Sequence, residues 1–228
     1  NRDALIKHAV AYVNLDVAAT GPNFSASCTP GLQSAITASS IANDITPPKN
    51  LGVPGGGSDH VPFIEIAGVE SMAFGFHGGS GVYHSALDTP YLIEKFLDPG
   101  YVHHARATQM AVDVATRLSA SETSVDGTAS WLRQMQKALD GTQHTEHFSV
   151  EHRATISDLI NQLLEQNADQ PQTAGHTFHH KFLPTGGRSL LWNSAGYGAA
   201  WFPGLANEGG AGQLIAILRS CIRPAKKQ

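Results

Sequence analysis

The sequence predicts an α/β fold that changes to a helical region near residue 120. Two apolar segments rich in β-forming residues, 9–19 and 70–76, alternate with helical patterns in the first half. Beyond residue 120 helical patterns dominate. The chain has 228 residues, of which 41% are hydrophobic, so it can bury a core without disulfide or metal staples. We therefore expect two parts, residues 1–119 and residues 120–228.

The first part is expected to contain parallel strands. Residues 9–19 form the first strand and stop at a Thr-Gly-Pro-Asn turn, 20–23. A helix over 30–43, a glycine-rich loop over 51–59 and a short helix over 63–67 follow. The second strand, 70–76, leads into a glycine loop, and a helix spans 101–118. Two strands are too few for a complete doubly wound sheet, so we expect this part to be the second half of a larger domain.

The second part is expected to be helical. Apolar residues recur at helical spacing over 128–139, 150–166 and 210–222, and Ser149 is a suitable N-cap for the middle helix. The stretch 171–209, rich in His, Gly and Pro, is predicted to be mostly loop. The apolar stripes of these helices either pack within the chain or form a surface for a partner.

Composition excludes some classes of function. The formal net charge is −4 and the only basic run is Lys226-Lys227, so nucleic acid is not an expected partner. No apolar stretch approaches the ~18 residues of a membrane span, so none is expected. Two cysteines, Cys28 and Cys221, are too few for a disulfide framework or a cysteine-based zinc site. The 12 histidines instead suggest a metal.

Three segments could carry chemistry. Asp16 ends an apolar strand, where α/β sheets bind ligands, although it could also cap the following turn. Ser58 and Asp59 follow three glycines and could either contact a ligand or cap a helix. His84 follows the second strand, and Asp88 could hold its second ring nitrogen. The alternative is a loop histidine with Asp88 as a cap.

The remaining histidines carry no recognisable ligand spacing. His103-His104, the run His144, His147 and His152, and the group His176, His179 and His180 lack cysteine partners, so we interpret them as surface residues. The chain has no Gly-x-Ser-x-Gly elbow and neither cysteine has a papain-type context, so a serine or cysteine nucleophile has no support.

Taken in order, the motifs resemble one family, the co-catalytic zinc exopeptidases that include glutamate carboxypeptidase II and the transferrin receptor. The resemblance extends over the whole chain but is weak in the middle. The matching segments are Ala11-Tyr12-Val13-Asn14-Leu15-Asp16, Cys28-Thr29-Pro30, Gly57-Ser58-Asp59-His60-x-Pro62-Phe63, Tyr83-His84-Ser85-x-x-Asp88-Thr89, Glu94-Lys95-Phe96-x-Asp98-Pro99 and Trp201-Phe202-Pro203-Gly204.

The resemblance implies a fold, a reaction and site residues. The fold would be the C-terminal half of a zinc-peptidase α/β/α sandwich followed by a helical, transferrin-receptor-like dimerisation region. Asp16 and His84 would be metal ligands, one for each of two zinc ions that activate a shared water for peptide hydrolysis. Tyr83 would stabilise the oxyanion of the tetrahedral intermediate. Ser58, Asp59 and Tyr197 fall where family members contact the peptide substrate.

The chain also departs from the family. The other ligands of the family, and the adjacent glutamates that include its general base, lie upstream of the strand that contains Asp16, so this chain begins too late to hold them. We expect a C-terminal portion of an exopeptidase that is inactive without the preceding half of the same protein and that binds little or no zinc alone. Family members mostly act outside the cytoplasm, which the resemblance implies for the parent protein.

The resemblance bears on specificity and partners too. Ala73, Gly75 and Gly196 stand where glutamate-specific members carry two arginines and a lysine, so a neutral or apolar substrate residue is expected. The helical region implies a homodimer. A non-catalytic binding or dimerisation module of the transferrin-receptor type is the alternative, and retention of Asp16 and His84 favours the enzyme. A glutaminyl-cyclase-like transferase is a third, weaker possibility.

Overall fold

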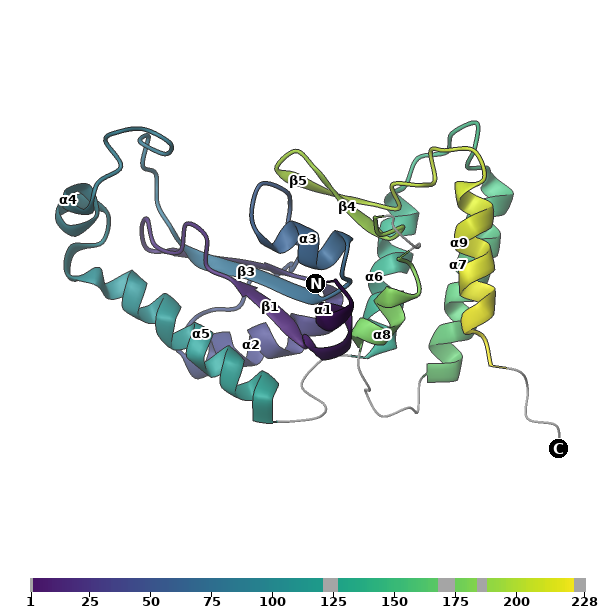
Figure 1. Ribbon diagram of the computed structural model, residues 1–228, viewed down its shortest axis with the longest axis horizontal. Coiled ribbons are helices and arrows are strands. Elements are labelled where there is room, and N and C mark those ends of the chain that lie inside the picture. The colour runs from purple at the N-terminus through teal and green to yellow at the C-terminus, as the bar shows by residue number, and fades with distance from the viewer. Residues whose placement is uncertain (1, 121–126, 168–174, 184–187, 224–228) are drawn as a thin grey trace.

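The computed structural model describes residues 2–120, 127–167, 175–183 and 188–223, and the chain is a mixed α/β protein, as predicted (Figure 1). The elements of the first part are α1 (Arg2–His8), β1 (Ala11–Asn14), β2 (Asn23–Cys28), η1 (Pro30–Leu32), α2 (Gln33–Ala42), α3 (His60–Glu65), β3 (Glu70–His77), α4 (Pro90–Leu92), η2 (Ile93–Leu97), η3 (Pro99–Tyr101) and α5 (Val102–Ala120). Those of the second part are α6 (Thr128–Gly141), α7 (Val150–Asn167), α8 (Gly175–His180), β4 (Trp192–Ala195), β5 (Gly198–Trp201) and α9 (Gly210–Cys221).

The sheet of the first part is mixed rather than parallel. Its strand order is β1-β3-β2, with β1 parallel and β2 antiparallel to the central strand β3. The expected parallel pair is therefore confirmed, and β2 is an addition. Its segment Asn23–Cys28 contains two serines and a single large apolar residue, so it lacks the apolar character used to find the other strands.

Helices cover both faces of this sheet (Figure 1). On one face Met72, Phe74 and Phe76 of β3 are buried together with apolar residues of α2 and α5, such as Ile36 and Met110. On the other face α3 contacts β1 and β3, and the ring of Phe63 stacks on Tyr12 with centroids 4.0 Å apart. The strand β3 is therefore central in the sheet and covered on both faces.

The first strand ends earlier than predicted. The expected strand over 9–19 stops at Asn14, and Val17 adopts a left-handed backbone conformation with φ of 55°. A β-branched residue rarely adopts this conformation, so the turn is strained. Pairing resumes at Ala19, which bridges to Phe76. The interruption leaves the side chain of Asp16 exposed at the carboxyl end of β1.

The second part has its own apolar cluster. The stripes of α6, α7 and α9 are buried against one another, for example Leu132, Ile160 and Leu214. These stripes therefore pack within the chain, and the homodimer stays a prediction. The boundary between residues 119 and 120 also stays a prediction, and residues 121–126 lie outside the described residues.

The predicted loop over 171–209 is wrong in part, because it contains α8 and the hairpin of β4 and β5. The two strands join through Gly196 and Tyr197, and Gly196 has the positive φ, 61°, that such a tight turn needs. Ser149 accepts a hydrogen bond from the backbone N–H of His152, which confirms it as the cap of α7. None of the helices that the structure describes is long and apolar enough to cross a bilayer.

A buried carboxylate joins the two parts. The side chain of Glu70, at the start of β3, is fully buried and accepts hydrogen bonds from Trp131 Nε1 of α6 at 2.6 Å and from the backbone N–H of Gly31 at 3.1 Å. The hydroxyl of Thr29 also donates to it. Three donors satisfy the acceptor sites that burial removes from water. Glu70 thus fixes α6 against the sheet.

His179 gives the second part a pH dependence that can be tested. The prediction that it is a surface residue is wrong, because its ring packs against Trp131 and Ser189 and is fully buried. Burial lowers its pKa to about 3. Because the unfolded chain protonates this ring near pH 6.5 and the folded chain does not, stability is lost as pH falls below about 6.5. The loss expected from this residue between pH 7 and pH 5 is about 2 kcal/mol.

Urea unfolding at several pH values measures this loss, and His179→Phe should flatten the pH profile. The matched variant His8→Phe, at an exposed histidine, should leave the profile unchanged. Equal pH profiles for wild type and His179→Phe would exclude this role for His179.

Candidate functional site

A cavity of about 700 Å³ opens at the carboxyl edge of β1 and β3. Four of the six predicted site residues line it, namely Asp16, Tyr83, His84 and Tyr197. Asp16 follows β1, and Tyr83 and His84 follow β3. Because β1 and β3 are parallel, the segments that follow them emerge at the same edge of the sheet. Tyr197 reaches the cavity from the second part of the chain, in the turn between β4 and β5.

A chain of hydrogen bonds holds Asp16. Ser58 Oγ donates to Asp16 Oδ2 at 2.8 Å and accepts from Asn14 Nδ2, also at 2.8 Å. Asn14 Nδ2 is also 3.1 Å from His60 Nδ1, and His60 Nε2 is 2.6 Å from the carbonyl oxygen of Gly55. The carbonyl can only accept, so His60 donates from Nε2 and accepts at Nδ1. Both Asn14 and His60 are buried, so they give Asp16 a fixed support.

Ser58 therefore supports Asp16 in this structure, in addition to any contact with a ligand. Asp59 occupies the N-cap position of α3 but makes no side-chain capping bond, and it lies outside the set of residues that line the cavity. Its effect is electrostatic. Burial is the larger cause of the raised pKa of Tyr12, and the negative charge of Asp59 raises this pKa further.

The glycine-rich loop packs against the hairpin rather than against open space. A Cβ atom added at Gly55 or Gly56 would lie 1.9 Å from the carbonyl oxygen of Tyr197 or Gly196, respectively. The backbone N–H of Gly56 also donates to Gly198 O at 3.1 Å. The glycines thus permit a close backbone approach, as predicted from their type, but the approach is to β4 and β5.

Glu65 also holds the hairpin of β4 and β5 in place. This buried residue, at the end of α3, accepts hydrogen bonds from the backbone N–H and the hydroxyl of Ser194, at 2.6 and 2.7 Å. Arg188 Nε lies 3.4 Å from its other carboxylate oxygen. Glu65 and the glycine loop together position Tyr197 at the cavity.

Tyr83 and His84 form an exposed pair. Their rings stack with centroids 3.8 Å apart, and His84 has a φ of 59°. Asp88 lines the same cavity, but no hydrogen bond joins it to His84 in the described part of the chain. The pKa of Tyr83 is raised by desolvation, and then by Tyr197 and Asp16. The phenol of Tyr83 is therefore a hydrogen-bond donor at neutral pH.

His104 is a cavity residue that the sequence analysis assigned to the surface. Its Nδ1 lies 2.7 Å from Oδ2 of Asp98, a carboxylate that is 1% exposed, and its ring lines the cavity. Asp98 also accepts from the backbone N–H groups of His103 and His104, at 3.0 Å each. Burial alone would raise the pKa of Asp98. The hydrogen bonds from His103 and His104 together lower it by more, so the pKa of Asp98 lies below its usual value. The segment Glu94-Lys95-Phe96-x-Asp98-Pro99 could have signalled this contact.

Two other histidines that the sequence analysis singled out, His144 and His152, stabilise a turn. His144 Nδ1 lies 3.2 Å from the carbonyl oxygen of Phe148, and His152 Nδ1 accepts from the backbone N–H of Ser149. Within the described residues no three His, Cys, Asp or Glu side chains are grouped so that they could hold a metal ion. The cavity is lined by five side chains of metal-binding type, Asp16, His77, His84, Asp88 and His104, but no three of them are grouped around one point.

No family model matches the sequence. Curated relatives do match it. A probable glutamate carboxypeptidase of Arabidopsis thaliana, LAMP1, is 31% identical over 178 residues, which cover 70% of this chain and 25% of the relative. The aminopeptidase NAALADL1 of Rattus norvegicus is 29% identical over 120 residues, which cover 49% of this chain and 16% of the relative. A glutamate carboxypeptidase 2 homolog of Caenorhabditis briggsae is 26% identical over 219 residues, or 78% of this chain and 28% of the relative.

The chain thus spans about a quarter of the length of the curated relatives that it matches, or less. These relatives carry the names of peptidases that act at a chain end, and the match confirms the resemblance found in the motifs. The chain belongs to the family of the glutamate carboxypeptidases and NAALADL-type aminopeptidases.

Proposed function

We propose that this chain supplies part of the active site of a zinc-dependent exopeptidase. The observation that carries the proposal is the meeting of Asp16, Tyr83, His84 and Tyr197 at one cavity, in a chain related to peptidases. Carboxylate and imidazole are ligands that zinc takes, so the donor types fit. When bound, zinc would supply an activated water for hydrolysis.

The residues of this chain have separate roles in the proposal. Asp16 and His84 are the two metal ligands, and Ser58 keeps the carboxylate of Asp16 in one orientation. Tyr83 donates a hydrogen bond to the oxygen that gains negative charge when the peptide carbonyl is attacked, and its raised pKa keeps the proton in place. Tyr197 and Ser58 contact the substrate, and Asp59 contributes negative charge nearby.

Two donors do not complete a zinc site, which needs at least three protein ligands and an open position for water. The 228 residues contain no adjacent pair of glutamates to provide a base and a ligand. In this proposal the remaining ligands and the general base come from a region that this chain does not contain. The chain alone is then inactive.

The expected substrate residue is neutral or apolar. Gly75 has no room for a long cationic side chain, because a Cβ atom there would lie 2.9 Å from the carbonyl oxygen of Ala18 and 3.2 Å from His77. Neither Gly75 nor Ala73 nor Gly196 can supply a charged clamp for a second carboxylate. A homodimer through the helical part and a site of action outside the cytoplasm belong to the same proposal.

Zinc binding by the 228-residue chain tests the ligand assignment. Equilibrium dialysis should show weak binding, and His84→Ala and Asp16→Ala should each weaken it at least tenfold. The matched variant His147→Ala, at a histidine outside the cavity, should leave it unchanged. A peptide-hydrolysis assay with added zinc should show no turnover.

Two outcomes would contradict the proposal. Turnover by the chain that His84→Ala abolishes would show that the chain holds its own general base. If neither His84→Ala nor Asp16→Ala changes zinc binding, then neither residue is a zinc ligand. The non-catalytic binding module would then be the better hypothesis.

A further inference from the structure

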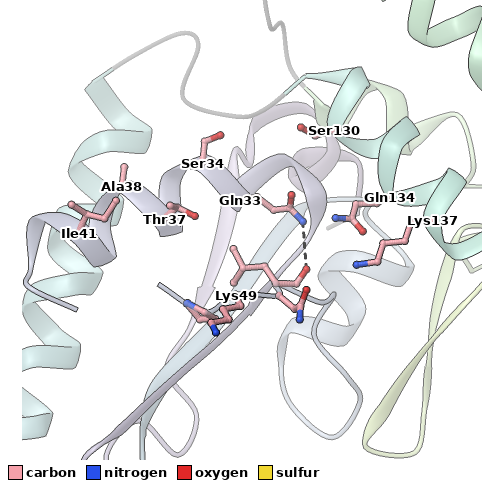
Figure 2. A pocket seen from close by; sticks show the side chains of 12 residues that line it. Gln33, Ser34, Thr37, Ala38, Ile41, Lys49, Ser130, Gln134 and Lys137 are labelled. Carbon is pink, nitrogen blue, oxygen red and sulfur yellow. Dashed lines mark hydrogen bonds between the residues drawn. The ribbon is translucent and has the colours of Figure 1, made fainter. Parts of the chain in front are cut away.

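A second cavity, of about 650 Å³, lies away from the candidate active site, between α2 and α6 (Figure 2). One wall comes from α2 and the loop that follows it, and the other comes from α6. Figure 2 shows Gln134 of α6 pointing toward Gln33 of α2 and Lys137 pointing into the cavity below it. Gln33 Nε2 donates to the carbonyl oxygen of Leu51 at 3.4 Å. The cavity therefore spans the two parts of the chain.

The lining of this cavity is cationic although the chain is anionic. Lys49 and Lys137 line it, and no aspartate or glutamate does, whereas the whole chain has a net charge of −4. Arg133 and Asp140 lie one helical turn before and after Lys137 on the exposed side of α6, and their opposite charges offset each other. The charge of the residues that line the cavity is therefore opposite in sign to that of the molecule.

Neither lysine takes part in the ion pairs found among the described residues, which involve other cations. Both side chains are exposed at the rim, while Gln33, Thr37 and Gln134 are half-buried below them. Amide N–H and hydroxyl groups are donors that can bind an oxyanion beside the two ammonium groups.

We propose that this cavity binds a small ligand that carries an oxyanion group, phosphate or carboxylate. Lys49 and Lys137 neutralise the charge from opposite walls, and the amide groups of Gln33 and Gln134 and the hydroxyl of Thr37 donate hydrogen bonds. Because the walls belong to the two parts of the chain, the bound ligand also links α6 to α2. The site is independent of the proposed peptidase function.

Calorimetric titration of the 228-residue chain with inorganic phosphate, in 0.15 M NaCl, tests the proposal. We expect saturable binding with a dissociation constant in the millimolar range or tighter. Lys49→Ala and Lys137→Ala should each weaken it severalfold, and the double variant at least tenfold. At 20 mM phosphate the melting temperature should rise by about 2 °C or more relative to NaCl of equal ionic strength.

Two further variants separate a site from a general charge effect. Gln134→Glu places a carboxylate in the cavity at nearly constant shape and should abolish binding. Lys95→Ala removes a lysine that pairs with Glu94 elsewhere and should bind phosphate like the wild type. A parallel titration with citrate tells whether carboxylates bind as well. Absence of saturable binding up to 20 mM for both anions would overturn the proposal. So would equal affinity of the wild type and the double variant.

Discussion

Replacing Trp131 with alanine is expected to lower the free energy of unfolding by about 4 kcal/mol. The indole is fully buried in the cluster of the second part, where it packs against His179 and Trp201 with ring centroids 4.4 and 6.1 Å apart. Its removal leaves a large cavity among helices that do not collapse freely. The same change deprives the buried carboxylate of Glu70 of a donor.

The ring and the N–H group of Trp131 can be measured separately. Trp131→Phe keeps most of the packing but removes the donor to Glu70, and should cost about 1–3 kcal/mol. Trp192→Phe makes the same chemical change at another fully buried tryptophan, whose Nε1 has no hydrogen-bond partner in the part of the chain that the structure describes. It should cost less than Trp131→Phe, because no hydrogen bond is lost.

Urea unfolding followed by far-ultraviolet circular dichroism gives all three free energies without depending on tryptophan fluorescence. Equal losses for the two phenylalanine variants would show that the bond between Trp131 and Glu70 contributes nothing specific. The contact would then not explain how α6 is held against the sheet.

The long helices of this chain were predictable because their signal is local, whereas the short helices α1 and α8 were missed. Apolar spacing and capping predicted the helices observed as α5, α6, α7 and α9 to within a few residues. The strand β2 was missed because its partner, β3, lies far away in the sequence. The hairpin was missed although β4 and β5 pair locally, because its sequence carries little strand signal. Phe24 packs against an apolar cluster and Trp192 is fully buried, but their neighbours in the sequence are mostly small or polar and give little period-two contrast.

In the candidate site, too, residues with a local sequence signal were predictable and residues that depend on tertiary contacts were not. Asp16 and His84 could be named from the sequence because each follows a recognisable strand and belongs to a motif. The supports of the site could not, since Asn14, His60 and the pair of Asp98 and His104 become meaningful only when buried polar groups find their partners in the fold. The glycines of the loop over 51–59 predicted a close backbone contact, but the sequence could not show that the contact is with the hairpin of β4 and β5.

Replacing Gly56 with alanine is expected to lower the free energy of unfolding by about 3 kcal/mol and to displace the hairpin that carries Tyr197. A Cβ atom at this position would lie 1.9 Å from the carbonyl oxygen of Gly196 and 2.9 Å from Ser194 Cβ. One contact is with backbone, so rotation of a side chain cannot relieve it. The hydrogen bond from Gly56 N–H to Gly198 O is expected to break as the hairpin moves away from the glycine-rich loop.

The matched variant is Gly52→Ala, four residues earlier in the same loop, where a Cβ atom would meet nothing within 4 Å. It should change stability by less than 0.5 kcal/mol, in keeping with an exposed position. Urea unfolding measures both changes, and the amide resonances of residues 194–198 report the movement of the hairpin. Because Glu65 still anchors Ser194, displacement should be greatest at the turn. Unperturbed resonances at Tyr197 in Gly56→Ala would show that the glycine loop does not position this residue at the cavity.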